Sequence, residues 1–70
     1  MAKYKEGDKV KWSWGNGSAS GTVKSIFEKK VSRKIDGSEV TRDGSKDNPA
    51  YYIKREDNNV LKLESEISKA

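Results

Sequence analysis

The chain has 70 residues, a formal net charge of +4, and neither cysteine nor histidine. Without cysteine there are no disulfides or thiolate metal sites, and without histidine the commonest general base and metal ligand are missing. We expect a single domain over residues 1–70, and a domain of this size buries only about 60% of the surface that its unfolded chain exposes.

The composition lies between those of ordered and disordered chains. Charged residues make up 37% and hydrophobic residues 31%, but two Trp, three Tyr and one Phe favour a packed centre. We expect a basic, monomeric protein with an ordered core from about residue 4 to residue 69. No apolar segment has the length of a signal peptide or a membrane span, so the sequence predicts a cytoplasmic protein without a membrane partner.

The first predicted strand is Asp8–Trp14, which alternates apolar and polar residues. Val10, Trp12 and Trp14 share one face, and the lysines between them share the other, as in a sheet with one solvated side. The following segment, Gly15–Ser18, contains the residues that a tight reversal requires. The sequence therefore predicts a hairpin whose apolar face is covered.

The second predicted strand is Ala19–Phe27. Val23 and Ile26 are three residues apart and cannot share a face of a regular strand, so we expect a bulge near Lys24 and Ser25. Gly21 eases the bend that such a bulge introduces. Bent strands allow a short sheet to curl into a small barrel.

The rest of the chain is predicted to continue as strands and turns. Val31–Ile35 and Glu39–Arg42 flank Asp36-Gly37, a strong hairpin signal. This hairpin has few apolar residues, and we expect it to project as a long, mobile arm. The turn-like residues 43–49 separate it from the last strands, Ala50–Arg55 and Val60–Leu63.

A short helical turn is predicted at Ser65–Ser68, where it places Ile67 over one end of the barrel. The turns and short strands leave no amphipathic helix of useful length. The sequence therefore predicts an all-β protein, and at this length the economical architecture is a five-stranded small barrel with a projecting hairpin.

Four segments give the chain a family resemblance: Gly7–Trp12, Gly21–Val23, Asp47–Ile53 and Val60–Glu66. Through them, from about residue 4 to residue 69, the chain resembles small bacterial and fungal proteins of the hypervirulence-associated Tudor-domain family. The resemblance implies a Tudor-like, Src-homology-3-type barrel. It implies no chemistry, because the biochemical function of that family is not established, and function must be sought in particular sites.

Nothing in the sequence favours an enzyme, and we expect no catalytic residues, metal or small-molecule cofactor. Ser18 and Ser45 lack an activating base. The segment Asp43–Asn48 is similar in composition to a calcium-binding loop, but it contains a lysine and no bidentate acid follows at the required spacing. Gly15–Gly17 is a hairpin turn and lacks the Lys-Ser/Thr ending of a phosphate-binding loop.

The sequence predicts a non-catalytic binding module for nucleic acid or a protein partner. Lysines and arginines of the first strand and of the hairpin would form one phosphate-binding face if they converged, with aromatic rings beside them to stack on bases. The candidate contact residues are the aromatic Trp14, Tyr51 and Tyr52 and the cationic Lys11, Arg33 and Lys34.

Three alternatives remain open. Tudor readers hold methylated lysine or arginine in an aromatic cage, and Trp14 matches one cage position, with Tyr51 or Tyr52 as a later wall. A sheet edge or the hairpin arm could add a strand to a partner protein. Finally, the same rings could belong to the core and the same charges to an ordinary solvated surface.

Overall fold

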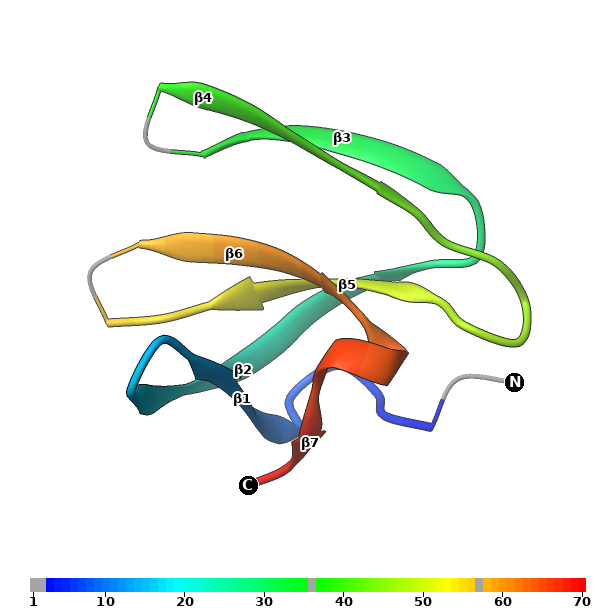
Figure 1. The fold of residues 1–70 in the computed structure, drawn as a ribbon. Helices are drawn as coiled ribbons and strands as arrows, with labels where there is room; N and C mark the ends of the chain where they lie inside the picture. Colours follow the sequence, from blue (N-terminus) through cyan, green and yellow to red (C-terminus); the bar gives the residue numbers. More distant parts are fainter. Residues whose placement is uncertain (1–2, 36, 57) are drawn as a thin grey trace.

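The computed structural model describes residues 3–35, 37–56 and 58–70 (Figure 1). Within these ranges the protein is built of short strands and a single 3-10 turn. In chain order the elements are β1 (Lys9–Trp14), β2 (Gly17–Phe27), β3 (Lys30–Ile35), β4 (Ser38–Asp43), β5 (Ala50–Lys54), β6 (Asn59–Leu63), the 3-10 turn (Glu64–Glu66) and β7 (Ser68–Lys69). The all-β prediction is confirmed.

The strands form two separate sheets. The larger has five antiparallel strands in the order β6-β5-β2-β1-β7, and the smaller is the β3–β4 hairpin (Figure 1). The large sheet ends at β6 on one side and at β7 on the other, and the hairpin stacks on it without joining its ladder. The closed five-stranded barrel predicted from the sequence is therefore not confirmed.

Apolar side chains pack on both faces of the large sheet, because consecutive residues of a strand point to opposite faces. The face with the larger core is called the inner face here, and the opposite one the outer face. The inner core contains Tyr4, Val10, Trp12, Ala19, Val23, Tyr51, Ile53 and Ile67. The outer core contains Val31, Ala50 and Leu61, with Phe27, Ile35, Val40, Tyr52 and Leu63 packed against it.

The β3–β4 hairpin lies over the outer face of β5 and β6, and the prediction that it projects from the sheet is wrong (Figure 1). Only 6% of the Val31 surface is exposed. The reason is that Leu61 and Leu63 of β6 point outward and need an apolar cover, which the hairpin provides with its few apolar side chains. Asp36, part of the predicted turn of this hairpin, lies outside the described residues.

The predicted bulge in β2 is confirmed, since the β2–β5 register shifts between Val23 and Ser25. Gly21 has a stronger role than easing a bend. A Cβ atom built on Gly21 would lie 2.6 Å from Ile53 Cγ2 and 2.7 Å from the Lys54 carbonyl oxygen. The end of β5 thus crosses β2 closely at this point, and only glycine leaves room for it.

The predicted helical turn is present as the 3-10 turn at Glu64–Glu66, one residue earlier than expected. Ile67 follows it and is buried in the inner core, with 7% of its surface exposed. The turn is not capped by a serine. Instead, the carboxylate of Glu66 accepts a hydrogen bond of 2.8 Å from the Leu63 N–H.

Candidate ligand-binding surface

Tyr51, one of the three candidate contact aromatics, is fully buried in the inner core. Its hydroxyl donates a 2.8 Å hydrogen bond to Glu64 Oε1 and accepts a 3.2 Å bond from the Tyr4 N–H. Burial of the phenol is the main cause that raises the Tyr51 pKa to about 12, and the Glu64 carboxylate adds to it. The ring is not accessible for stacking on a ligand.

The other two candidate aromatics lie in different places. Trp14 is at the end of β1, opposite Gly17, and exposes 61% of its surface. Tyr52 is half-buried beneath the hairpin, where its hydroxyl accepts a 2.8 Å hydrogen bond from Asn59 Nδ2. Because Tyr51 and Tyr52 are consecutive in β5, they point to opposite faces of the sheet. These three rings therefore do not form one aromatic cage.

The two candidate cations of the hairpin also have separate surroundings. The Arg33 guanidinium lies 4.7 Å from the centre of the Phe27 ring, and Arg33 Nη1 donates a 2.8 Å hydrogen bond to the Ser32 carbonyl oxygen. Lys34 lines a small hollow together with Tyr52. Among the predicted site residues, Lys34 and Tyr52 are thus brought together.

The basic residues of β1 and those of the hairpin do not converge into one surface. The hairpin lies against β6, whereas β1 is separated from β6 by β5 and β2 (Figure 1). Lys11 and Arg33 therefore belong to different parts of the surface. The condition for a shared phosphate-binding face of β1 and the hairpin is therefore not met, because the hairpin covers β5 and β6.

Lysines and hydroxyl residues cover the outer face of β1 and β2 instead. Residues paired across strands lie on the same face, so Lys9, Thr22 and Lys54 form one row across β1, β2 and β5. Lys11 and Ser20 form the next row. We call these five residues the basic face. The hairpin covers only the β5–β6 half of the outer face, which leaves this half open.

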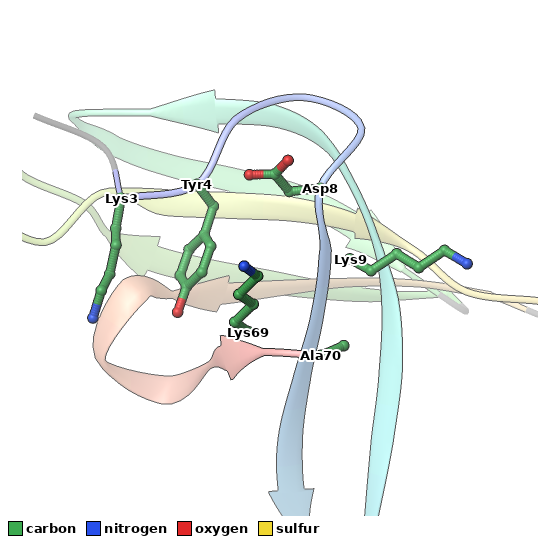
Figure 2. A pocket seen from close by; sticks show the side chains of 6 residues that line it. All are labelled: Lys3, Tyr4, Asp8, Lys9, Lys69 and Ala70. Carbon is green, nitrogen blue, oxygen red and sulfur yellow. The ribbon is translucent and has the colours of Figure 1, made fainter.

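Three shallow hollows share Ala70, two of them on the basic face and one at the β1–β7 edge, where Tyr4 and Lys69 belong to the inner face. The first, shown in Figure 2, is lined by Lys3, Tyr4, Asp8, Lys9, Lys69 and Ala70. The second is lined by Lys9, Ser20, Gly21, Thr22, Lys54, Arg55, Glu56 and Ala70. The third is lined by Lys11, Ser18, Ala19, Ser20, Arg55, Glu56 and Ala70. Figure 2 shows the Lys69 side chain pointing into the first hollow and the Lys9 side chain pointing out of it.

The positive charge of the basic face is not neutralised within the described part of the chain. Lys9, Lys11 and Lys54 have no carboxylate within ion-pair distance among the described residues. Glu66, by contrast, pairs with Arg42 at 3.1 Å and with Lys62 at 4.0 Å. A surface with unpaired lysines beside hydroxyls can attract an anionic ligand and donate hydrogen bonds to it.

Sequence reasoning missed several members of this surface. It singled out Lys11, but Lys54 comes from a distant strand, and Ser20 and Thr22 carry no charge. The strand alternation was a usable signal, because it places the side chains of Lys9 and Lys11 outward. The register that sets Thr22 beside Lys9 and Lys54 follows from turn length and from the bulge.

Within the described ranges, no group of three or more Asp, Glu, His or Cys residues is arranged to hold a metal ion. Nor does any helix in those ranges have the length and apolar character needed to cross a membrane.

The fold defines a small all-β domain that presents an open, polar sheet face. The family model described as "Hypervirulence associated proteins TUDOR domain" matches residues 7–67, and the chain belongs to this family. The resemblance seen in the sequence is thereby confirmed. No curated protein and no solved structure was matched in the corresponding comparisons.

Proposed function

We propose that the protein is a non-catalytic binding module for the phosphate backbone of single-stranded nucleic acid. The observation that carries the proposal is the basic face, where lysines and hydroxyls alternate across three strands. Phosphate oxygens are bound mainly by lysine and arginine and by the hydroxyls of serine and threonine. The rows Lys9-Thr22-Lys54 and Lys11-Ser20 provide both kinds of group.

The local charge balance supports a polyanion. Six cationic and two acidic side chains line the three hollows, and the difference of +4 equals the net charge of the whole chain. Two carboxylates, Asp8 and Glu56, lie among the described lining residues. The positive charge of the molecule is thus concentrated on the surface that the hairpin leaves open, and such a surface attracts phosphate chains over a distance.

The aromatic residue best placed to contact a base is Trp14, whose ring is largely exposed at the end of β1. Trp14 belongs to the inner face, so a base stacks on its ring where a bound strand passes from the basic face around the end of β1. Tudor domains commonly bind proteins or nucleic acids, which supports the same class of ligand. A reader of methylated residues is not favoured, because Tyr51 is buried and Tyr52 lies on the other face.

The proposal is tested by titrating a labelled thymidine oligonucleotide about twelve nucleotides long with the full chain. We expect the logarithm of affinity to fall linearly with the logarithm of salt concentration. Replacing Lys9, Lys11 and Lys54 together by glutamine should reduce that slope by about 2, because each lost contact on a single strand contributes about 0.7.

The matched control replaces Lys29, Lys30 and Lys34 of the hairpin side by glutamine, with the same loss of charge. We expect this control to keep nearly the full slope and affinity. Equal losses in the two triple variants would mean that only net charge matters, and would overturn the basic face as the site. Failure of the unaltered protein to bind the oligonucleotide at low salt would overturn the proposed function itself.

A further inference from the structure

A second surface of the molecule is the open edge of β2. β1 pairs with β2 from Gly17 to Thr22, but β5 pairs with it only from Thr22 to Phe27. Gly21 lies against the end of β5, but the segment Gly17–Ser20 has a strand on one side only among the described residues. No strand occupies the lane beside Gly17–Ser20 there, because β5 ends at Lys54 and the chain then turns, with the Arg55 N–H donating to the Asn58 carbonyl oxygen at 2.8 Å.

The backbone groups that face this lane can be identified from the hydrogen bonds nearby. The Val23 N–H donates to the Asp8 carbonyl, and the Val23 carbonyl accepts from the Gly7 N–H, both at 2.9 Å. Val23 thus turns its backbone groups away from β5. Because successive residues alternate, Ser18 and Ser20 turn theirs toward the empty lane. Two residues of a strand span about 6.8 Å, which is also the repeat of an added strand.

The side chains around this edge differ on the two faces of the sheet. On the outer face, Lys11 lies beside Ser20. The Arg55 guanidinium lies on the inner face, 6.0 Å from the centre of the Trp12 ring, and Arg55 and Glu56 border the hollow that Lys11 and Ser20 line. On the inner face, Trp14 lies opposite Gly17, and because Gly17 has no side chain, nothing in β2 covers the ring at that position. An added strand would therefore place alternate side chains against cations and against an aromatic surface.

We propose that the edge Gly17–Ser20 binds an extended segment of a partner protein in which acidic and apolar residues alternate. The segment occupies the lane beyond the end of β5. It pairs with the backbone of Ser18 and Ser20, directs its acidic side chains toward Lys11 on the outer face, and directs its apolar side chains toward Trp14 on the inner face, where Arg55 borders the lane. Strand addition of this kind takes affinity from main-chain hydrogen bonds and specificity from alternate side chains.

Charge complementarity selects this occupant over a second copy of the chain. Pairing of two β2 edges would bring Lys11 and Arg55 of one copy close to their counterparts, and each copy carries a net charge of +4. An acidic segment neutralises these cations instead. Alternating N–H and C=O groups along the edge match a peptide backbone, whereas a phosphate chain offers acceptors alone.

The test uses a capped peptide of about seven residues with alternating valine and aspartate as the probe, added to the full chain. We expect amide hydrogen exchange at Ser18 and Ser20 to slow by about tenfold or more at saturation. Methylating the peptide nitrogens that face β2 should weaken binding by about tenfold or more, because these donors are lost. Methylating the alternate set should leave the affinity nearly unchanged.

A pair of proline variants supplies the matched control. Ser20→Pro removes a backbone donor that faces the empty lane. Ser13→Pro removes one from the opposite edge of β1, since the Lys9 carbonyl accepts from the Ala70 N–H there and Ser13 follows the same alternation. We expect Ser20→Pro to lose peptide binding and Ser13→Pro to keep it. If Ser20→Pro does not fold, the comparison of the two methylated peptides tests the proposal.

Three outcomes would overturn the proposal. The first is an acidic peptide that does not bind, and the second is equal affinity for both methylated forms. The third is equal affinity for a peptide in which lysine replaces aspartate. Oligonucleotide binding is measured on Ser18→Pro, which also removes a backbone donor facing the lane but leaves all five residues of the basic face unchanged, and we expect this variant to lose the peptide and to retain the oligonucleotide. The edge and the basic face are thus tested separately.

Discussion

The hydroxyl of Tyr51 lies 2.8 Å from the carboxylate of Glu64, and this pair holds together segments that are distant in the chain. The same Glu64 oxygen accepts a 2.7 Å hydrogen bond from the Lys3 N–H, and the Tyr51 oxygen accepts one from the Tyr4 N–H. The Tyr4 ring meets the Tyr51 ring edge to face, with centroids 5.7 Å apart. The segment before β1 is thereby fastened to β5 and the 3-10 turn.

Replacing Tyr51 by phenylalanine should lower the free energy of unfolding by about 1 kcal/mol near neutral pH, because a buried hydrogen bond is lost. The difference in unfolding free energy between the two proteins should decrease at alkaline pH. The Tyr51 pKa is raised from 10.0 to about 12 in the folded state. The unfolded chain releases this proton first, so the contribution of Tyr51 is complete below pH 10.0 and is lost as pH rises toward about 12. Urea unfolding at several pH values measures this difference in free energy, and a difference that does not change with pH would contradict this account.

Gly21→Ala should destabilise the protein by about 1–3 kcal/mol, because the new methyl group meets the Lys54 backbone and Ile53. The backbone oxygen cannot move without displacing the end of β5. Gly17→Ala in the same strand is the matched control, since a Cβ there has no heavy atom within 4 Å. Chemical unfolding measures both variants, and a Gly21 variant as stable as the Gly17 variant would refute the close crossing of β2 and β5.

Val31→Ala should cost about 1.6 kcal/mol of unfolding free energy, because two methyl groups leave the outer core. Glu39→Ala on the neighbouring strand is exposed and should change stability by no more than about 0.5 kcal/mol. Thermal or urea unfolding distinguishes the two. If the Val31 variant behaved like the Glu39 variant, the hairpin would not pack on β6 in solution.

Trp12→Ala and Trp14→Ala should have unequal effects although the residues are two apart in one strand. Trp12 is buried in the inner core, and its removal should cost about 3–5 kcal/mol. Trp14 is mostly exposed, so its removal should cost less than about 1 kcal/mol while weakening the binding of oligonucleotide and peptide. Comparable losses of stability would show that Trp14 is a structural residue.

Local patterns in the sequence were enough to predict several features of the fold. Alternation predicted that Val10, Trp12 and Trp14 share a covered apolar face; Val10 and Trp12 are buried, whereas Trp14 at the end of the strand is exposed. The unequal spacing of Val23 and Ile26 revealed the bulge, although Ile26 itself is only half-buried. Such features depend on neighbouring residues of a single strand, so one segment contains the whole signal.

The position of the β3–β4 hairpin could not be predicted in the same way. The hairpin has too few apolar residues for its own sequence to predict that it packs on the sheet. Its packing follows only once Leu61 and Leu63, far along the chain, are known to point toward it. The residues of the candidate site could not be predicted together for the same reason. Lys11 was recognised from its own strand, but Thr22 and Lys54 of the same surface belong to strands whose register the sequence did not specify.

The pairing of β1 with both β2 and β7 affects the order of assembly. β2 follows β1 after a two-residue turn, whereas β7 is the last strand of the chain. During synthesis on the ribosome the first hairpin can close early. The pairs of Val10 with Lys69 and of Lys11 with Ser68 form only after β7 has been made. Contacts between such remote segments slow folding, so completion of this sheet should be the late step that limits the rate at which newly made molecules mature.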